Sequence, residues 1–229
     1  MTTVVLAHAF PLDERMWEPQ LAALSGRDAA TPNLYDLGGS SMDGWAQRLL
    51  EDLDGDLAVV GASMGGYLAL ALARQAPERV RALLLAGARP DADSQERREG
   101  RAGTIELIQR EGSEGLWENQ RDKLLADDAS LEVVERVEEM TLAREPSELV
   151  RAVDAIRDRP DNTEVLRAIP VVFAVGEGDL LFPPGEAARF AGLSEPARLA
   201  VFPRSRHLPN LEQPDEFNRL LTDFLQAYC

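Results

Sequence analysis

A serine lies between glycines in the segment Gly61-Ala62-Ser63-Met64-Gly65. This spacing fits the G-x-S-x-G pattern, in which the serine occupies a tight turn between a strand and a helix. Small residues two positions to either side let the flanking segments pass closely, so that the hydroxyl projects from the turn. The helix that follows would point its N-terminus at the same place, which favours a developing negative charge. The pattern predicts a nucleophile at Ser63; the alternative is a plain glycine turn.

A serine hydroxyl is a poor nucleophile unless a base takes its proton. The sequence has two histidines, His8 and His207, and each follows a predicted strand. His207 follows the last of these strands, and loops at the carboxyl ends of strands are where the sites of α/β proteins are built. We therefore expect His207 to be the base. The alternative for a single histidine in a loop is an ordinary surface position.

The base in turn needs a carboxylate that orients its ring and stabilises its charged form. Asp179 ends the segment Gly176-Glu177-Gly178-Asp179, in which a predicted strand runs into a turn. This position would place it at the same sheet edge as Ser63 and His207. Two alternatives are an aspartate that only shapes the turn and the neighbouring Glu177, which precedes the turn. We expect Asp179 to be the acid.

These side chains can meet only if a parallel sheet brings them to one edge. Short apolar runs predict buried strands at 3–7, 28–34, 57–60, 82–86, 171–175 and 199–202. Helical spacing and helix-forming residues predict helices at 42–53, 67–74, 186–191 and 216–227. Near-continuous apolar strands alternating with helices indicate a parallel sheet that is covered on both faces.

The pattern changes between Pro90 and Asp161, where no strand is predicted. Helices are expected instead at 105–111, 116–125, 131–143 and 147–157, the last two with a clear apolar face. A helical insertion in an α/β sheet commonly covers the active site; the alternative is a plain helical decoration. The predicted organisation is a core of residues 1–89 and 162–229 with a helical cap at 90–161.

Composition limits the partners of this chain. Its net charge of -16 disfavours nucleic acid and anionic membrane surfaces, and it argues against multiply anionic substrates. The one cysteine, Cys229, permits no intrachain disulfide, and no signal peptide or membrane-spanning run is found. No dinucleotide, P-loop or zinc motif is present. We expect a cytoplasmic protein with a small-molecule substrate, no cofactor and no metal.

The segments that carry this chemistry resemble the α/β-hydrolase superfamily, in particular its small esterase, lactonase and C–C hydrolase branch. His8-Ala9-Phe10-Pro11 resembles the family's H-G-F-P segment, and Gly61–Gly65 resembles its nucleophile turn. Gly176–Asp179 resembles its acid turn, and His207–Pro214 its histidine loop. The order of serine, aspartate and histidine along the chain is also that of the family. The resemblance covers nearly the whole length.

The resemblance implies an α/β-hydrolase fold, with a mostly parallel sheet of about six strands, helices on both faces and a helical cap. It implies that the backbone N–H groups of Phe10 and Met64 bind the oxyanion of the reaction. It also implies that His8 supports the oxyanion loop and is not a base. Ala9 stands where the family usually has glycine, which would give that loop a different shape.

The function implied is that of a serine hydrolase, which cleaves a small carboxylic ester or lactone through an acyl-enzyme. Trp117, Met140, Leu181 and Phe182 would line an apolar pocket and favour an apolar ester or lactone; the alternative is that they are ordinary core residues. Other functions reached on the same fold are C–C bond hydrolysis, cofactor-free haloperoxidase or perhydrolase activity, and ligand-dependent signalling without catalysis.

Overall fold

The computed structural model describes residues 2–195 and 198–229 of the chain. Its centre is a six-stranded sheet in the order β2-β1-β3-β4-β5-β6, in which all neighbours pair in parallel. The strands are β1 (Thr2–Ala7), β2 (Ala29–Ala30), β3 (Asp56–Ala62), β4 (Val80–Ala86), β5 (Val171–Gly176) and β6 (Arg198–Phe202). The parallel sheet of about six strands predicted from the sequence is confirmed.

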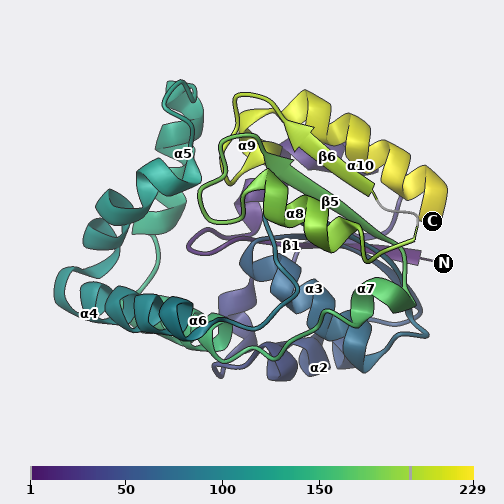
Figure 1. Cartoon of the computed structure of the whole chain (residues 1–229), viewed down its shortest axis with the longest axis horizontal. Helices are drawn as coiled ribbons and strands as arrows, with labels where there is room; N and C mark the ends of the chain where they lie inside the picture. Colours follow the sequence, from purple (N-terminus) through teal and green to yellow (C-terminus); the bar gives the residue numbers. More distant parts are fainter. Residues whose placement is uncertain (1, 196–197) are drawn as a thin grey trace.

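Both faces of the sheet are buried, as the continuous apolar strands predict. Successive strand residues point to opposite faces, so Leu57 and Val59 of β3 contact one core cluster while Ala58 and Val60 contact the other. The first cluster includes side chains of α2 (Met42–Asp52), α3 (Met64–Gln75) and α8 (Pro184–Ala191). The second includes side chains of η1 (Glu14–Trp17), η2 (Ala22–Leu24) and α10 (Pro214–Tyr228). Helices α2, α3, α8 and α10 flank the sheet in Figure 1.

Strand β2 is shorter than the expected strand at 28–34. Only Ala29 and Ala30 pair with β1, and Pro32 follows, which has no N–H to give to a strand ladder. Asn33 then caps the 3-10 helix η3 (Leu34–Leu37), since its side chain accepts a hydrogen bond from the Tyr35 N–H. Local capping therefore replaces strand pairing at this edge of the sheet.

Residues 90–161, which we call the insertion, separate β4 from β5 and carry three helices. These are α4 (Gln95–Leu124), α5 (Leu131–Leu142) and α6 (Pro146–Arg157); the short α7 (Val165–Ala168) follows next to the core. Figure 1 shows the insertion beside the sheet, on the side away from both chain ends. The N-terminus, where β1 begins, lies on the side of the sheet away from the insertion (Figure 1). Because all strands are parallel to β1, their carboxyl ends face the insertion.

Helix α4 begins about one-third of its length before the predicted helix at 105–111. Ser94 starts it, because its side chain accepts a hydrogen bond from the Arg97 N–H. The first turns are charged and carry no apolar stripe, which is why apolar spacing missed them. Gly112 has non-helical angles (φ 68, ψ -157) and divides α4 between the two segments predicted as separate helices.

Candidate active site

Ser63 is the first residue after β3 and the cap residue of α3, at the edge of the sheet that faces the insertion. Its backbone angles (φ 48, ψ -110) lie in a region that non-glycine residues rarely adopt. The Ser63 N–H donates to the Ala86 carbonyl at the end of β4, at 2.7 Å. This bond and the start of α3 hold the strained turn, which aims the hydroxyl away from the sheet.

The two glycines of the turn are required because backbone segments pass very close to them. A Cβ added at Gly61 would lie 2.3 Å from the Gly65 carbonyl oxygen. A Cβ added at Gly65 would lie 2.0 Å from the Ala7 carbonyl oxygen in β1. Both distances are far below van der Waals contact, so the G-x-S-x-G spacing is a packing requirement of the strand-to-helix turn.

The structure brings the three predicted side chains together. His207 Nε2 lies 2.9 Å from Ser63 Oγ, and His207 Nδ1 lies 2.8 Å from Asp179 Oδ2. Asp179 follows β5 and His207 follows β6, so each side chain comes from the carboxyl end of a different parallel strand. The Asp179 and His207 side chains are buried, whereas Ser63 is partly exposed.

The surroundings of Asp179 select one hydrogen-bonding arrangement. Its Oδ1 accepts from the backbone N–H groups of Leu181 and Phe182, at 2.8 and 2.9 Å. Its Oδ2 is then directed at His207, where a carboxylate can only accept a proton from Nδ1. This arrangement puts the proton of a neutral ring on Nδ1 and leaves the Nε2 lone pair for the Ser63 hydroxyl. Such a serine can lose its proton to the ring.

The backbone N–H groups of Phe10 and Met64 are free to bind a ligand. Met64 is the first residue of α3, and its N–H has no acceptor within the helix. Among the described residues, no atom accepts a hydrogen bond from either N–H. Phe10 lines the same cavity as Ser63. The two donors named from the sequence therefore stay available at this edge of the sheet.

Ala9 fits its loop without backbone strain. Among the described residues other than glycine, only Ser63 and Arg204 have a positive φ, so the position does not need glycine. The Ala9 side chain is buried in the core, and its N–H lies 3.1 Å from the sulfur of Met16. The substitution of glycine by alanine is thus accommodated by packing.

His8 has a structural environment and does not contact Ser63. Its Nε2 accepts from the Leu34 N–H at 2.9 Å, and its Nδ1 donates to the Ala9 carbonyl at 3.0 Å. Burial lowers the pKa of this ring from 6.5 to about 4, so His8 is neutral at physiological pH. Its two hydrogen bonds join the Phe10 loop to the first residue of η3.

Glu212 is a residue to which the sequence reasoning assigned no role. It ends the short helix α9 (Pro209–Glu212) and accepts from the Ser205 hydroxyl and the Arg206 N–H, at 2.8 and 2.9 Å. It also accepts from the Ala126 N–H of the insertion, at 2.7 Å. Glu212 therefore fastens the loop that carries His207 to the end of α4. The only sequence feature that could have drawn attention to Glu212 was its position within His207–Pro214, the segment that resembles the family's histidine loop.

Ser63 and His207 stand at the wall of a cavity of about 310 Å³. The cavity also has an apolar part, formed by Phe10, Leu124, Ile156, Leu180 and Leu181.

The expected apolar pocket differs from this cavity. Of the four residues expected to line it, only Leu181 does so. Trp117 and Met140 are buried in the core cluster that contains α10, and Phe182 packs between Phe173 and Phe190. The prediction was wrong for these three because an amphipathic pattern shows which side chains are buried but not whether a cavity lies beside them.

No metal site or membrane-crossing helix is found in the part of the chain that the structure describes. In that part, no three residues among His, Cys, Asp and Glu are grouped so that they could hold a metal ion. None of its helices combines the length and the apolar character needed to cross a membrane.

A sequence model of the alpha/beta hydrolase family matches residues 4–220. The chain belongs to this family. A similar protein is a pimeloyl-[acyl-carrier protein] methyl ester esterase of Aromatoleum aromaticum, 29% identical over 98% of both chains. Another relative, the 2-hydroxy-6-oxo-2,4-heptadienoate hydrolase of Pseudomonas putida, is 30% identical over 81% of this chain and 71% of its own.

A solved structure of the same fold is that of a thermophilic esterase from Thermogutta terrifontis, with malate bound. It superposes with a TM-score of 0.92 and 30% sequence identity, over 99% of this chain and 90% of its own. The agreement extends over the insertion as well as the sheet, so the whole described chain has the arrangement of an alpha/beta hydrolase.

Proposed function

We propose that this protein is a serine hydrolase that cleaves a small carboxylic ester or lactone through an acyl-enzyme. The observation that carries the proposal is the chain of contacts from Ser63 Oγ through His207 to Asp179, at 2.9 and 2.8 Å. The names of the relatives from Aromatoleum and Thermogutta, both esterases, support the same bond type. The residues that carry the chemistry come from carboxyl ends of three strands, as the family's topology requires.

In the first half of the proposed reaction, Ser63 Oγ attacks the carbonyl carbon and His207 Nε2 takes the hydroxyl proton. Asp179 keeps the ring oriented and stabilises its positive charge. The carbonyl oxygen becomes an oxyanion, which receives hydrogen bonds from the Phe10 and Met64 N–H groups. The His207 proton then passes to the leaving alkoxide, the ester bond breaks, and the alcohol departs from the acyl-enzyme.

In the second half, a water molecule replaces the alcohol. His207 takes a proton from the water, and the resulting hydroxide attacks the acyl carbon. Collapse of this second intermediate breaks the bond to Ser63 Oγ, which regains its proton from His207. For a lactone the alcohol and the acid belong to one molecule, so a single hydroxy acid is released. Protonated His207 cannot act in either half, and we expect activity to fall in acid.

A fluorophosphonate probe tests the nucleophile directly, since it reacts only with an activated serine. We expect the wild-type chain to be labelled and to hydrolyse short aryl esters, and Ser63→Ala to lose both properties. The matched control is Ser25→Ala, at an exposed serine without a side-chain hydrogen bond among the described residues. Labelling that persists in Ser63→Ala, or that disappears in Ser25→Ala, would refute the assignment.

Cleavage of a C–C bond is the second candidate, favoured by the Pseudomonas putida relative. The substrate in that relative's name carries a ketone in place of an ester. The same nucleophile and base can attack a ketone, with a carbanion equivalent as leaving group in place of an alkoxide. Product analysis with a ketone and an ester of matched shape separates the two, because only ester cleavage releases an alcohol.

A further inference from the structure

The cavity beside Ser63 is positively charged in a strongly negative protein. Among its lining residues, four carry a fixed positive charge, and we call them the basic wall: Arg89, Arg97, Arg101 and Lys123. No aspartate or glutamate is among the described residues that line it. The chain has a net charge of -16, and Lys123 is its only lysine. With this net charge an average part of the protein surface is acidic, so the positive charge of the cavity needs an explanation.

The basic wall is built mainly by the two halves of α4. Before the break at Gly112, the lining residues Arg97, Arg101 and Thr104 are spaced by three or four and share one helix face. After the break, Lys123 and its neighbour Leu124 line the cavity from the second half. The broken helix therefore turns both of its halves towards Ser63.

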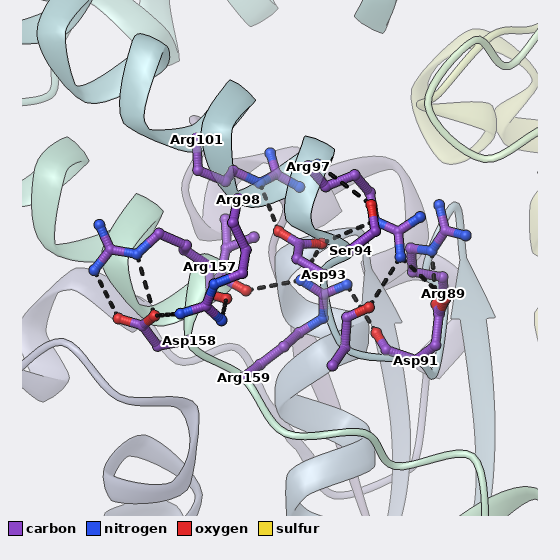
Figure 2. Close-up of polar contacts among 12 residues, drawn as sticks. Arg89, Asp91, Asp93, Ser94, Arg97, Arg98, Arg101, Arg157, Asp158 and Arg159 are labelled. Atoms are coloured by element: carbon purple, nitrogen blue, oxygen red, sulfur yellow. Dashed lines mark hydrogen bonds and ion pairs between the residues drawn. The ribbon is translucent and has the colours of Figure 1, made fainter.

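Carboxylates behind the basic wall neutralise it only in part. Asp93 accepts from Arg101 Nε at 3.2 Å and pairs with Arg159 at 2.8 Å. Asp91 pairs with Arg89 and Arg97, at 2.7 and 3.1 Å. Figure 2 shows these carboxylates among the arginines, between the start of α4 and the core.

The charges of this group do not cancel. Glu186 is the third carboxylate and pairs with Arg89 at 2.6 Å. Four arginines, Arg159 and three of the basic wall, share these three carboxylates, and Lys123 pairs with none of them. Within the described chain, no atom accepts a hydrogen bond from Nη1 of Arg89, Arg97 or Arg101, nor from Nη2 of Arg101. The wall keeps both net charge and free donors.

We infer that the site takes an ester or lactone whose far end carries one ionised oxyanion, a carboxylate or a phosphate, which the basic wall binds. This inference rests on the proposed function and names its substrate class. Guanidinium groups match such oxyanions with two parallel hydrogen bonds, and partial enclosure reduces the screening of the charges by water. The apolar part of the cavity would hold the carbon chain between the oxyanion and the carbonyl.

Lys123 makes it possible to test the proposed binding role of the cations apart from a purely structural role. Arg97 and Arg101 also anchor the insertion through Asp93, so their presence has a second explanation. Lys123 has no ion pair among the described residues and donates only to Asn119, one turn earlier on α4. Its replacement leaves the contacts between the insertion and the core unchanged, so an effect on substrate charge preference reports on binding.

The kinetic test compares monomethyl adipate with its neutral carboxamide, which has the same length and the same scissile ester. We expect kcat/KM of the wild-type chain to favour the charged ester about tenfold or more, as for hydrogen bonds to charged groups. Lys123→Gln and Arg101→Gln should remove most of this preference. The readout is the ratio of kcat/KM for the charged ester to that for the carboxamide, so that a general change in activity cancels. A methyl carboxylate ester of equal chain length that carries an ionised phosphonate group at its far end shows which oxyanion is preferred.

Two neighbours on α4 serve as controls. Arg98→Gln alters a residue that pairs with Asp158 at 2.8 Å and does not line the cavity. Arg121→Gln alters a residue that faces a different surface depression. Both variants should keep the wild-type preference. An equal rate for charged and neutral esters in the wild-type chain, or a preference that survives Lys123→Gln together with Arg101→Gln, would overturn the inference.

A binding measurement tests the proposed substrate class independently of turnover. In Ser63→Ala protein, reductive methylation with ¹³C gives Lys123 an NMR reporter that keeps its positive charge. We expect adipate to shift this signal saturably, and the uncharged diamide of adipate to leave it unchanged. Inactivity of the wild-type chain on every ester, with saturable binding retained, would contradict only the proposed function. Absence of adipate binding contradicts the substrate class.

Discussion

His8 and His207 differ in what surrounds their imidazole rings. His8 is fully buried, and both of its ring nitrogens are used by backbone groups of Ala9 and Leu34. His207 lies between a carboxylate and a hydroxyl at the wall of the cavity. A buried ring without a counter-ion resists protonation, whereas a ring beside a carboxylate can carry a charge during a reaction. The same residue type therefore has a structural environment at one position and, at the other, the contacts that the proposed reaction requires.

The neutral state of His8 makes the stability of the protein depend on pH. Because burial lowers its pKa from 6.5 to about 4, the unfolded chain binds a proton between these values that the folded chain does not. The stability that His8 contributes is complete above pH 6.5 and decreases as the pH falls towards 4. Between pH 7 and pH 5 the loss should be about 2 kcal/mol.

Urea unfolding of wild-type and His8→Asn protein across this pH range checks the expectation. The variant should be less stable at neutral pH, because asparagine cannot make both hydrogen bonds of the ring. Its stability should fall less with acid than that of the wild-type chain, since no buried imidazole remains to be protonated. Parallel pH curves for the two proteins would contradict the assignment of a depressed pKa to His8.

The loop from β6 to α9 is the element that positions His207. The His207 N–H donates to the Leu124 carbonyl at 3.1 Å, and Glu212 joins Ser205 and Arg206 to Ala126. Burial raises the pKa of Glu212, and its hydrogen bonds to backbone N–H groups act against that increase. The base is thus held as much by the end of α4 as by its own strand.

Glu212→Gln should loosen this element. A glutamine side chain has one acceptor oxygen, so either the Ala126 N–H or the Ser205 and Arg206 donors lose their partner. We expect a decrease of about 1–2 kcal/mol in the free energy of unfolding. We also expect about a tenfold slower reaction with the fluorophosphonate probe, because the base is less well placed.

Glu216→Gln is the matched control, at an exposed glutamate on α10. It removes only a charge near the N-terminus of α10, so it should lower the free energy of unfolding by less than about 1 kcal/mol and leave the labelling rate unchanged. If Glu212→Gln lowers stability but reacts with the probe at the wild-type rate, Glu212 only stabilises the loop and does not position the base.

At the scale of the whole molecule, Asp93 connects the insertion to the core. Its side chain is fully buried and pairs with Arg159, which lies with its guanidinium carbon 4.0 Å from the Tyr67 ring centroid on α3. Arg159 also donates to the backbone carbonyl of Ile156, near the end of α6, and to that of Asp91, in the connection from β4 to α4. Burial alone would raise the pKa of Asp93, but the charges of Arg159 and Arg101 outweigh it and hold the pKa below its usual value.

Asp93→Asn should leave Arg159 as a buried charge without a counter-ion. We expect a loss of about 3 kcal/mol in the free energy of unfolding, with faster amide hydrogen exchange in the first half of α4 and in α6. Asp158→Asn is the control, because its pairs with Arg98 and Arg157 are exposed and contribute below about 1 kcal/mol. Equal losses in the two variants would show that the Asp93 cluster does not anchor the insertion.

Much of the fold could be predicted because its signals are local. The buried strands β1, β3, β4 and β5 are continuous apolar runs, and α3 is rich in alanine and leucine. The start of α4 could not be predicted in this way, since Ser94 capping and ion pairs to Asp91 and Asp93 support it in place of an apolar face. The length of β2 was overestimated from its apolar residues, although Pro32 and the Asn33 cap, both local signals, end it after Ala30.

By itself the sequence determined the order of strands and helices, the strained serine turn and the three side chains that could act together. Each of these follows from residue type and spacing, because steric limits and burial act over a few neighbouring residues. Only the tertiary structure decided which side chains face the cavity. A charged residue on a helix looks the same in sequence whether it meets water or an enclosed site, so the basic wall emerged only once both halves of α4 were seen to turn towards Ser63.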